Sequence, residues 1–395
     1  MKKKKLMFLI TGLYYGGMER VALIAHSLLK DEYDISLVTL YSGDKDYKLD
    51  FDYYDLKCTP KHSQFSKVIN TFNRIKKVKK IKNEINPDIV MSFGAPANFS
   101  NAVTKSNEKV ILGIRSYDWL YNYFATHQID KWTYNKADTV VSVSKVISKG
   151  ANLIFCLNEE KSKTLYNPYD LNYIEKKSYE IVEEGVFPDD CFNIISVGRL
   201  VNQKGYNHLV KAFSIVAKQF LNCNLYIIGG GEKESELIKL ISDLGLQDRI
   251  FLLGKKENPY KYMRKADIFV LSSITEGFPN AMVEAMAVGL PILAVDCKSG
   301  PREILSESSI DKKASEIELC EYGVIVPEVS KSLDYKSELI EECDYNISNG
   351  IIEFIKNPEM RKKYSRCSLQ RAGEFTYNRF KENLMTIIEN NENKI

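Results

Sequence analysis

The most informative run of residues is Ser272-Ser-Ile-Thr-Glu-Gly-Phe-Pro-Asn-Ala-Met-Val-Glu-Ala-Met-Ala-Val-Gly-Leu-Pro-Ile-Leu-Ala-Val-Asp296, which leads on to Gly300-Pro-Arg-Glu303. Apolar, β-branched residues just before it predict a buried strand at 267–272. Phe278-Pro279-Asn280 opens a predicted helix of good helix formers, and Gly289 ends that helix before Pro291 begins the next strand. A strand end, a glycine-containing turn and a helix start therefore meet at one point.

Two carboxylates lie at this point, Glu276 in the turn and Glu284 in the first turns of the helix. The unpaired N–H groups at a helix start carry partial positive charge, which suits a phosphate. Carboxylates accept hydrogen bonds, and the hydroxyl groups of a ribose or a hexose are their natural donors. The combination predicts a sugar-nucleotide site. The alternative is that Glu284 only complements the helix dipole and that Glu276 is a solvated loop residue.

The two glutamates and their neighbours resemble the signature of the family 4 retaining glycosyltransferases. The matching pattern is Glu-Gly-Phe-Pro-Asn-Ala-Met-Val-Glu-Ala-Met-Ala-x-Gly-x-Pro, from Glu276 to Pro291. This resemblance implies the GT-B fold, an α/β architecture of two facing, Rossmann-like, doubly wound domains with a cleft between them. It covers nearly the whole chain and is most specific from Ser196 to Pro301.

Length and composition agree with a two-domain globular protein. The chain has 395 residues, of which 44% are hydrophobic and 27% are charged. Its eight scattered cysteines form no Cys-x-x-Cys pair, which argues against a zinc site or a disulfide framework and favours a reducing compartment. The lysine-rich start is like that of a signal peptide, but its apolar run is short, so we interpret it as a first strand. No other apolar run reaches the roughly 20 residues of a membrane helix.

Charge is distributed unevenly along the chain. Residues 1–170 contain 26 Lys+Arg and 18 Asp+Glu, a net charge of +8, whereas the remainder contains 29 and 34, a net charge of −5. This asymmetry predicts an anionic partner for the first half, either a membrane surface or a phosphorylated acceptor, and no nucleic acid is expected.

A basic amphipathic helix is predicted at Lys67–Ile85. Apolar residues recur there at steps of three and four: Val68, Ile69, Phe72, Ile75, Val78, Ile81 and Ile85. Cations surround this stripe: Arg74, Lys76, Lys77, Lys79, Lys80 and Lys82. Such a helix can lie on an anionic bilayer, each nearby cation contributing about 1 kcal/mol. It can equally be an ordinary surface helix whose stripe faces the core, because periodicity does not separate the two.

The first strand, Leu6–Ile10, leads through a glycine-containing turn with Gly16 and Gly17 into a predicted helix, Met18–Leu29. The turn lacks the Gly-x-Gly-x-x-Gly spacing of a dinucleotide site. It is similar to the N-terminal glycine loop of the family, which implies that it faces the donor diphosphate. A Gly-Gly pair is also common in turns without any such role.

Further predicted strands of the first half end in polar loops. These strands are 33–40, 88–93, 110–114 and 139–143. Open parallel sheets bind ligands at the carboxyl ends of their strands, so Arg115 and Asp118 become candidates for contacts with the acceptor or leaving group. A structural ion pair between them is the alternative.

Alternation of strands and helices restarts after Tyr166-Asn167-Pro168, which resembles the interdomain crossover of the family. We expect an N-terminal, acceptor-binding domain at 1–170, a nucleotide-sugar-binding domain at 171–375, and a C-terminal helix at 376–395 that crosses back to the first domain. The second domain has predicted strands at 192–197, 224–228 and 250–253 and predicted helices at 206–220 and 232–244. Segment 330–349 is expected to mix loop and helix before a helix from Ile351.

Two cations follow the first strand of this second domain in Gly198-Arg199-Leu-Val-Asn-Gln-Lys204-Gly205. A planar guanidinium fork and an ammonium on one strand-end loop can hold both phosphates of a diphosphate. The run matches the Gly-Arg-Leu…Lys-Gly motif of the family, and Gly229-Gly-Gly231 resembles its glycine turn near the nucleoside, which implicates Gly230.

The resemblance implies specific roles for these residues. Arg199 and Lys204 would bind the donor diphosphate with help from N–H groups around Gly277 and Phe278, and Asn280 would belong to the same site. Glu284 would accept from the ribose hydroxyls, and Glu276 from a hydroxyl of the transferred sugar, which makes Arg199, Lys204 and Glu276 the catalytic set. The resemblance also implies that no metal and no other cofactor is required. The four histidines show no metal-ligand spacing.

Together these features predict a glycosyltransferase, and the family resemblance implies that it retains the configuration at the anomeric carbon. It would move a sugar from a nucleotide-diphosphate sugar, expected to contain UDP rather than GDP, to a glycan acceptor on a lipid carrier in cell-surface polysaccharide assembly. The expected location is cytoplasmic and peripheral on the inner face of the cell membrane. Alternatives are a same-fold nucleotide-sugar epimerase, a non-catalytic sugar-nucleotide-binding protein, and a hydrolase that uses the two glutamates as its carboxylate pair.

Overall fold

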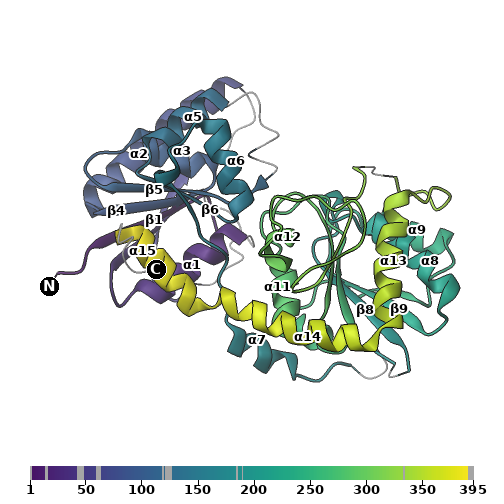
Figure 1. Ribbon diagram of the computed structural model, residues 1–395. Coiled ribbons are helices and arrows are strands. Elements are labelled where there is room, and N and C mark those ends of the chain that lie inside the picture. The colour runs from purple at the N-terminus through teal and green to yellow at the C-terminus, as the bar shows by residue number, and fades with distance from the viewer. Residues whose placement is uncertain are drawn as a thin grey trace. The chain divides into compact units, whose positions relative to one another are not determined.

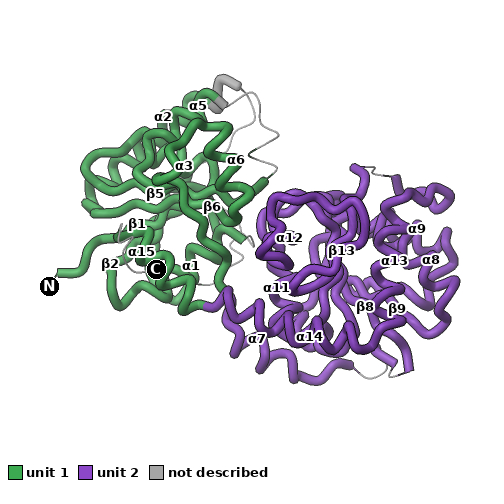
Figure 2. The backbone as a smooth tube through the Cα atoms, viewed as in Figure 1, with its two compact units in different colours: residues 1–168, 377–395 green, residues 169–376 purple. Residues whose placement is uncertain are grey.

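The computed structural model describes residues 2–13, 17–41, 49–58, 64–117, 120, 127–183, 186–188, 190–331 and 334–389. The chain forms two compact units, residues 1–168 with 377–395 (unit 1) and residues 169–376 (unit 2) (Figure 2). The chain thus enters unit 2 two residues before the boundary expected at 170, and the last helix belongs to unit 1.

Unit 1 contains a seven-stranded parallel sheet in the order β3-β2-β1-β4-β5-β6-β7. The strands are β1 (Lys5–Ile10), β2 (Asp34–Tyr41), β3 (Tyr54–Cys58), β4 (Ile89–Phe93), β5 (Lys109–Ile114), β6 (Thr139–Ser142) and β7 (Ser162–Thr164). The helices are α1 (Gly17–Leu29), α2 (Gln64–Ile85), α3 (Ala95–Val103), α5 (His127–Lys136), α6 (Lys145–Phe155) and α15 (Tyr377–Glu389).

Helices cover both faces of this sheet, with α1 and α15 on one side and α2, α3, α5 and α6 on the other (Figure 1). The central strand β1 shows why. Leu6, Phe8 and Ile10 join the apolar cluster that includes α1 and α15, whereas Met7 and Leu9 join the cluster of α2 and α3. Side chains alternate across a strand, so a strand that is apolar throughout needs cover on both faces.

Unit 2 has a second seven-stranded sheet in the order β10-β9-β8-β11-β12-β14-β13, in which only β13 is antiparallel. The strands are β8 (Phe192–Val197), β9 (Cys223–Ile228), β10 (Ile250–Leu252), β11 (Ile268–Leu271), β12 (Ile292–Val295), β13 (Glu318–Leu319) and β14 (Val324–Val326). The α-helices are α7 (Leu171–Ser178), α8 (Tyr206–Gln219), α9 (Glu234–Asp243), α10 (Tyr260–Met263), α11 (Asn280–Ala287), α12 (Pro301–Leu305), α13 (Glu342–Lys356) and α14 (Pro358–Ala372).

The strand order of unit 2 reverses between β8 and β11. β8 is followed in sequence by β9 on one side, whereas β11 and β12 extend the sheet on the other side. The loops that leave such a pair of strands diverge, and ligands of open parallel sheets bind in the resulting crevice. The loop with Arg199 and Lys204 follows β8, and the loop with Glu276 follows β11, so both motifs lie at this switch point.

An aspartate fixes the start of several strands. Asp88 accepts the N–H of Lys5 at 2.7 Å, Asp138 accepts that of Val110 at 2.8 Å, and Asp267 accepts that of Asn193 at 2.8 Å. In each case the carboxylate precedes one strand and bonds the start of its neighbour, which pins the register at the amino ends of the sheet. The loops at the opposite, carboxyl ends remain available for ligands.

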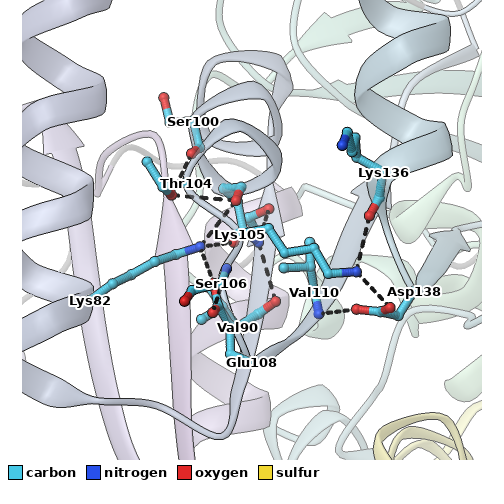
Figure 3. A network of polar contacts seen from close by, with 12 residues as sticks. Lys82, Val90, Ser100, Thr104, Lys105, Ser106, Glu108, Val110, Lys136 and Asp138 are labelled. Carbon is cyan, nitrogen blue, oxygen red and sulfur yellow. Dashed lines mark hydrogen bonds and ion pairs between the residues drawn. The ribbon is translucent and has the colours of Figure 1, made fainter.

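A buried ion pair stabilises the amino ends of unit 1 (Figure 3). Lys82 Nζ lies 2.6 Å from Glu108 Oε1 and 2.7 Å from Asn101 Oδ1, and it also donates to the Asn101 carbonyl at 3.0 Å. Beside it, Lys105 donates to Asp138 at 2.6 Å. Burial lowers the pKa of Lys82, while Glu108 acts in the opposite direction. All three ammonium hydrogens have acceptors, so this network is structural.

Two expectations for helices need correction. α2 begins at Gln64, and its apolar residues do not form one core-facing stripe: Val78, Ile81 and Ile85 are buried, but Val68, Ile69 and Phe72 are 57%, 47% and 62% exposed. α13 begins at Glu342, nine residues before the expected Ile351. The reason is a capping box, in which Glu341 and Asp344 satisfy each other's backbone N–H groups.

Within the part of the chain that the structure describes, no helix combines the length and apolar character required to cross a bilayer.

Candidate active site

The loop after β8 holds the first cation of the site. Arg199 is exposed, and its side chain makes no hydrogen bond or ion pair with the residues that the structure describes. It follows Gly198, whose N–H bonds the Ile228 carbonyl, and precedes Leu200, whose N–H bonds the Gly230 carbonyl. The backbone on both sides of Arg199 is therefore fixed while its side chain is available to a ligand.

Close contact between two loops explains the glycine turn after β9. A Cβ at Gly229 would overlap the carbonyl oxygen of Gly198, and the φ of Gly229 is 150°. Only glycine allows this approach. Gly230, the predicted nucleoside-side residue, packs against the side chain of Lys255, an exposed lysine that sequence reasoning did not single out.

The loops after β8 and β11 are bonded to each other. Gln203 accepts the N–H of Ile274 at 2.8 Å through its carbonyl and donates its side-chain amide to the Thr275 carbonyl at 3.0 Å. Gly205, at φ 61°, lies so close to Ser272 that a Cβ would overlap the Ser272 carbonyl oxygen. Ser272 in turn donates to the Lys204 carbonyl at 2.9 Å. These contacts bring the two predicted motifs together.

Lys204 and Glu276 form an ion pair at the centre of this arrangement. Lys204 Nζ lies 2.6 Å from Glu276 Oε1, and Ser273 donates its hydroxyl to the same oxygen at 2.7 Å. Glu276 is 7% exposed and Ser273 is 1% exposed. The pairing was not expected from sequence, which assigned Lys204 to phosphate and Glu276 to a sugar hydroxyl separately.

Two buried groups lie beside this ion pair. Burial raises the pKa of the Tyr206 hydroxyl, which is next to Gly198, and Glu276 adds to that effect. Burial also raises the pKa of the Cys297 thiol, to which Glu276 contributes in the same direction. Both groups stay neutral at physiological pH, so uncharged side chains flank the ion pair of Lys204 and Glu276.

The start of α11 presents backbone rather than side chains. Phe278 is buried, and its ring makes an edge contact with Phe375 at a centroid distance of 5.4 Å. The N-cap residue, Pro279, provides no side-chain cap. No side chain caps the start of α11, and a helix start carries the partial positive charge that suits an anion. Asn280, a predicted donor contact, accepts from the Tyr169 hydroxyl at 2.6 Å.

The loop after β12 supports the same turn from the other side. Ser299 donates to the Gly277 carbonyl at 3.0 Å, and residues 275 and 298 form an isolated parallel bridge. A buried pair anchors this loop, in which Arg302 donates to Asp296 at 2.7 Å and to Glu318 at 2.8 Å. These contacts fix the turn around Gly277 to the loop after β12.

Glu284 lies one turn into α11 and is 7% exposed. The Tyr260 hydroxyl of α10 is 3.4 Å from Glu284 Oε1, and the Tyr260 ring meets Tyr173 edge-on at 6.4 Å. Sequence reasoning missed Tyr260, because nothing in its local pattern connects a short helix at 260–263 with α11. The environment is that of an oriented carboxylate, as a ribose contact requires.

The structure describes only some of the predicted site residues of unit 1. Gly17 is the exposed first residue of α1, whereas Gly16 lies outside the described residues. Arg115 donates to the side-chain oxygen of Asn167, and its guanidinium lies 5.8 Å from the centroid of the Phe93 ring. Asp118 also lies outside the described residues, so both its expected contact with the acceptor or leaving group and the alternative of an ion pair stay untested.

A buried cluster in unit 2 contains potential metal ligands. His208 Nδ1 is 2.7 Å from Asp344 Oδ1 and 3.6 Å from Cys343 Sγ. Burial on its own would lower the pKa of His208, but Asp344 and Cys343 outweigh it and raise the pKa to about 9. The neighbours of His208 thus favour its protonated form, and the contact between His208 and Asp344 joins the first turn of α8 to the start of α13.

Comparisons with known proteins identify the family and the fold of this chain. The sequence model of the family described as glycosyl transferases group 1 matches residues 178–315. An uncharacterised glycosyltransferase of Methanocaldococcus jannaschii is 32% identical over 339 residues, which are 80% of this chain and 82% of that protein. A Campylobacter jejuni relative is 27% identical over 386 residues, covering 94% of this chain and 96% of the relative. Its name is N-acetylgalactosamine-N,N'-diacetylbacillosaminyl-diphospho-undecaprenol 4-alpha-N-acetylgalactosaminyltransferase.

Among solved structures, Anabaena HepE in complex with UDP superposes with a TM-score of 0.76 at 16% identity, covering 98% of this chain and 100% of that one. The two parallel α/β domains thus have the GT-B fold, which confirms the expected fold class. The chain belongs to the glycosyl transferases group 1 family and is a glycosyltransferase. These findings are consistent with family 4, which the Glu276 to Pro291 motif resembles.

Proposed function

We propose that the protein transfers a sugar from a UDP-sugar, with retention at the anomeric carbon, to a lipid-linked glycan acceptor in cell-surface polysaccharide assembly. The observation that carries this proposal is the arrangement at the β8–β11 switch point. The exposed guanidinium of Arg199, the Lys204–Glu276 pair and the uncapped start of α11 belong to neighbouring loops. Such a set provides cations and N–H groups for a diphosphate and a carboxylate for a sugar hydroxyl.

Departure of the nucleoside diphosphate is the step that these cations would assist. As the glycosidic C–O bond breaks, negative charge collects on the leaving phosphate. Arg199, Lys204 and the N–H groups of α11 would stabilise that charge, so the proposed reaction requires no metal ion. A leaving phosphate oxygen can take the proton of the acceptor hydroxyl on the same face of the sugar, which gives retention without a protein base.

The carboxylates would recognise the two sugars of the donor. Glu284 is buried and oriented by Tyr260, so we assign it to the ribose hydroxyls. Glu276 is oriented by Lys204 and Ser273, so we assign it to a hydroxyl of the transferred sugar. Gly230 and Lys255 lie on the nucleoside side of the site in this assignment. Arg115 and Asp118 stay candidates for acceptor contacts.

A lipid carrier and a peripheral position on the inner membrane face are supported by two observations. The Campylobacter relative carries diphospho-undecaprenol in its name. In addition, the exposed side of α2 combines Val68, Ile69 and Phe72 with exposed Lys76, Lys79 and Lys80. Exposed apolar residues followed by cations on one helix face suit the boundary region of an anionic bilayer.

Thermal melting in EDTA with UDP, GDP or NAD tests the donor site. A ligand at about 100 times its Kd adds about 2.7 kcal/mol to the state that it binds, which shifts the melting temperature by several degrees. We expect a shift with UDP that is unaffected by EDTA, and a smaller shift with GDP. A shift that requires Mg²⁺ would contradict metal independence, and a shift with NAD alone would contradict the donor assignment.

A further inference from the structure

One oxygen of Glu276 accepts two hydrogen bonds. Lys204 Nζ is 2.6 Å and Ser273 Oγ is 2.7 Å from Oε1. Among the described residues, no donor bonds Oε2, and Oε2 is not one of the enclosed polar atoms that lack a partner. The carboxylate thus has one oxygen held by the protein and a second oxygen that keeps contact with solvent.

Ser273 is well placed to hold that orientation. Its side chain is 1% exposed, and a hydroxyl group has a single hydrogen to donate, which it gives to Glu276. The residue lies three positions before Glu276 on a loop that Gln203 and Ser272 tie to the neighbouring loop. Serine at this position therefore restrains the rotation of the carboxylate from within a rigid turn.

Lys204 alone would hold Glu276 Oε1 less consistently than Ser273 does. Its ammonium group has three donors, and in the function proposed above at least one of them turns toward the donor diphosphate. When the cation shifts toward phosphate, the hydroxyl of Ser273 still holds Oε1. Oε2 then faces a substrate hydroxyl in the same direction whether or not the phosphates are bound.

We propose that Ser273 is a positioning residue that acts through Glu276 on the sugar part of the donor. This inference rests on the proposed function, because it assumes that Glu276 accepts from a hydroxyl of the transferred sugar. Its distinctive consequence is a difference between ligands. Ser273 contributes to the affinity for a UDP-sugar and much less to the affinity for UDP, which lacks the sugar.

The experiment compares four proteins: wild type, Ser273→Ala, Glu276→Gln and the double variant. Dissociation constants are measured calorimetrically for UDP, UDP-glucose, UDP-galactose, UDP-N-acetylglucosamine and UDP-N-acetylgalactosamine. For at least one sugar, we expect Ser273→Ala to weaken UDP-sugar binding relative to UDP by about 10-fold, as for a lost charge-assisted hydrogen bond. In the Glu276→Gln background the same substitution should change this ratio less than about twofold.

A matched control separates positioning from general weakening of the fold. Ser368 donates a buried hydrogen bond to the Leu290 carbonyl at 2.7 Å, so Ser368→Ala loses a comparable bond elsewhere in unit 2. This control should leave every UDP-sugar to UDP ratio unchanged. The inference is overturned if Ser273→Ala keeps all ratios within about threefold of wild type, or if it acts equally with and without Glu276. If wild type itself does not bind UDP, the proposed function fails as well.

Discussion

The hydroxyl of Tyr169 lies 2.6 Å from the side-chain oxygen of Asn280, and this bond joins the first residue of unit 2 to the first residue of α11. A second contact attaches the end of unit 2 to the same region. Phe375, one residue before the end of unit 2, packs its ring on Phe278 in the turn before α11. The two segments through which the chain enters and leaves unit 2 are thus both attached to the turn that carries Glu276.

The bond between Tyr169 and Asn280 can be measured by a double-mutant cycle. Tyr169→Phe removes the hydroxyl and leaves the ring in place, while Asn280→Ala removes the acceptor. We expect a coupling free energy of about 1 kcal/mol in urea unfolding, because each single substitution already breaks the same bond. Additive effects of the two substitutions would show that the bond contributes nothing to stability.

Arg199→Ala should weaken binding of UDP by roughly 10 to 150-fold, which corresponds to the loss of charge-assisted bonds of about 1.5 to 3 kcal/mol. Arg199→Lys should recover part of this loss, because an ammonium keeps the charge without the planar fork. Isothermal titration with UDP measures both. Arg366→Ala, at an exposed arginine of α14, is the control for the change in charge. Equal affinity in wild type and Arg199→Ala would end the assignment of Arg199 to the diphosphate.

Binding to anionic vesicles should depend on the exposed face of α2. Replacing Lys76, Lys79 and Lys80 by Gln should lower the partition into vesicles with phosphatidylglycerol by about 100-fold, at about 1 kcal/mol for each cation. Phe72→Ser should also lower it, since this apolar ring is 62% exposed. Flotation at low and high salt measures the effect, which salt should weaken.

A second triple variant controls for total charge in the vesicle experiment: Lys218, Lys239 and Lys363, all exposed in unit 2, are changed to Gln. Equal flotation of the two triple variants would contradict a specific role of α2. Absence of flotation by wild type at low salt would contradict membrane binding altogether.

His208 should make the protein less stable at alkaline pH. Its pKa in the folded state is about 9, above its ordinary value of 6.5, because Asp344 and Cys343 outweigh the effect of burial. The folded state therefore holds the proton more tightly. The resulting stabilisation, up to about 3 kcal/mol, is complete below pH 6.5 and is lost as the pH rises to about 9. Urea unfolding across this range should show the decline in wild type.

The variant His208→Gln isolates this effect, because glutamine cannot titrate. Its free energy of unfolding should be lower than that of wild type at pH 6 and should change much less between pH 6.5 and 9. An identical slope in both proteins would assign the pH dependence to another group.

The buried pair of Lys82 and Glu108 should be sensitive to removal of one partner. Glu108→Gln leaves the Lys82 ammonium buried without its counter-charge, so we expect a loss of about 3 to 5 kcal/mol in unfolding free energy. Replacing both by Met and Leu should cost less, since no buried charge remains. The exposed pair of Lys80 and Glu84 provides the contrast, with an expected loss below about 0.5 kcal/mol for Glu84→Gln. Similar losses at both pairs would show that burial does not decide the outcome.

The fold and the motifs of the site could be predicted because their signals are local. Apolar strands alternate with amphipathic helices, and the glycines at 205 and 229 stand where two backbones approach closely. The meeting of the Lys204 loop with the Glu276 loop follows from strand order, since β8 and β11 are neighbours in the sheet. Sequence alone suggested proximity through the family resemblance and not through the residues themselves.

Other features depend on contacts that no local pattern encodes. One example is the ion pair between Lys204 and Glu276, which are 72 positions apart in the sequence. Another is the hydrogen bond from Ser273 to the same oxygen of Glu276, three positions further along the chain. Both contacts become visible only in the three-dimensional structure. On α2, the spacing predicted one stripe of seven apolar residues, but Phe72 in that stripe is 62% exposed. The start of α13 was a missed local signal, because Glu341 and Asp344 have the spacing of a capping box.

The bridge between Tyr169 and Thr376 places both ends of unit 2 side by side, so unit 2 is an insertion within unit 1. On the ribosome, unit 2 is complete as soon as residue 376 has emerged. Unit 1 must wait for α15, whose Phe380, Leu384 and Ile388 fill part of its core. Unit 2 is therefore expected to fold before unit 1, whose sheet is covered completely only after α15, a helix translated later than unit 2, has packed against it.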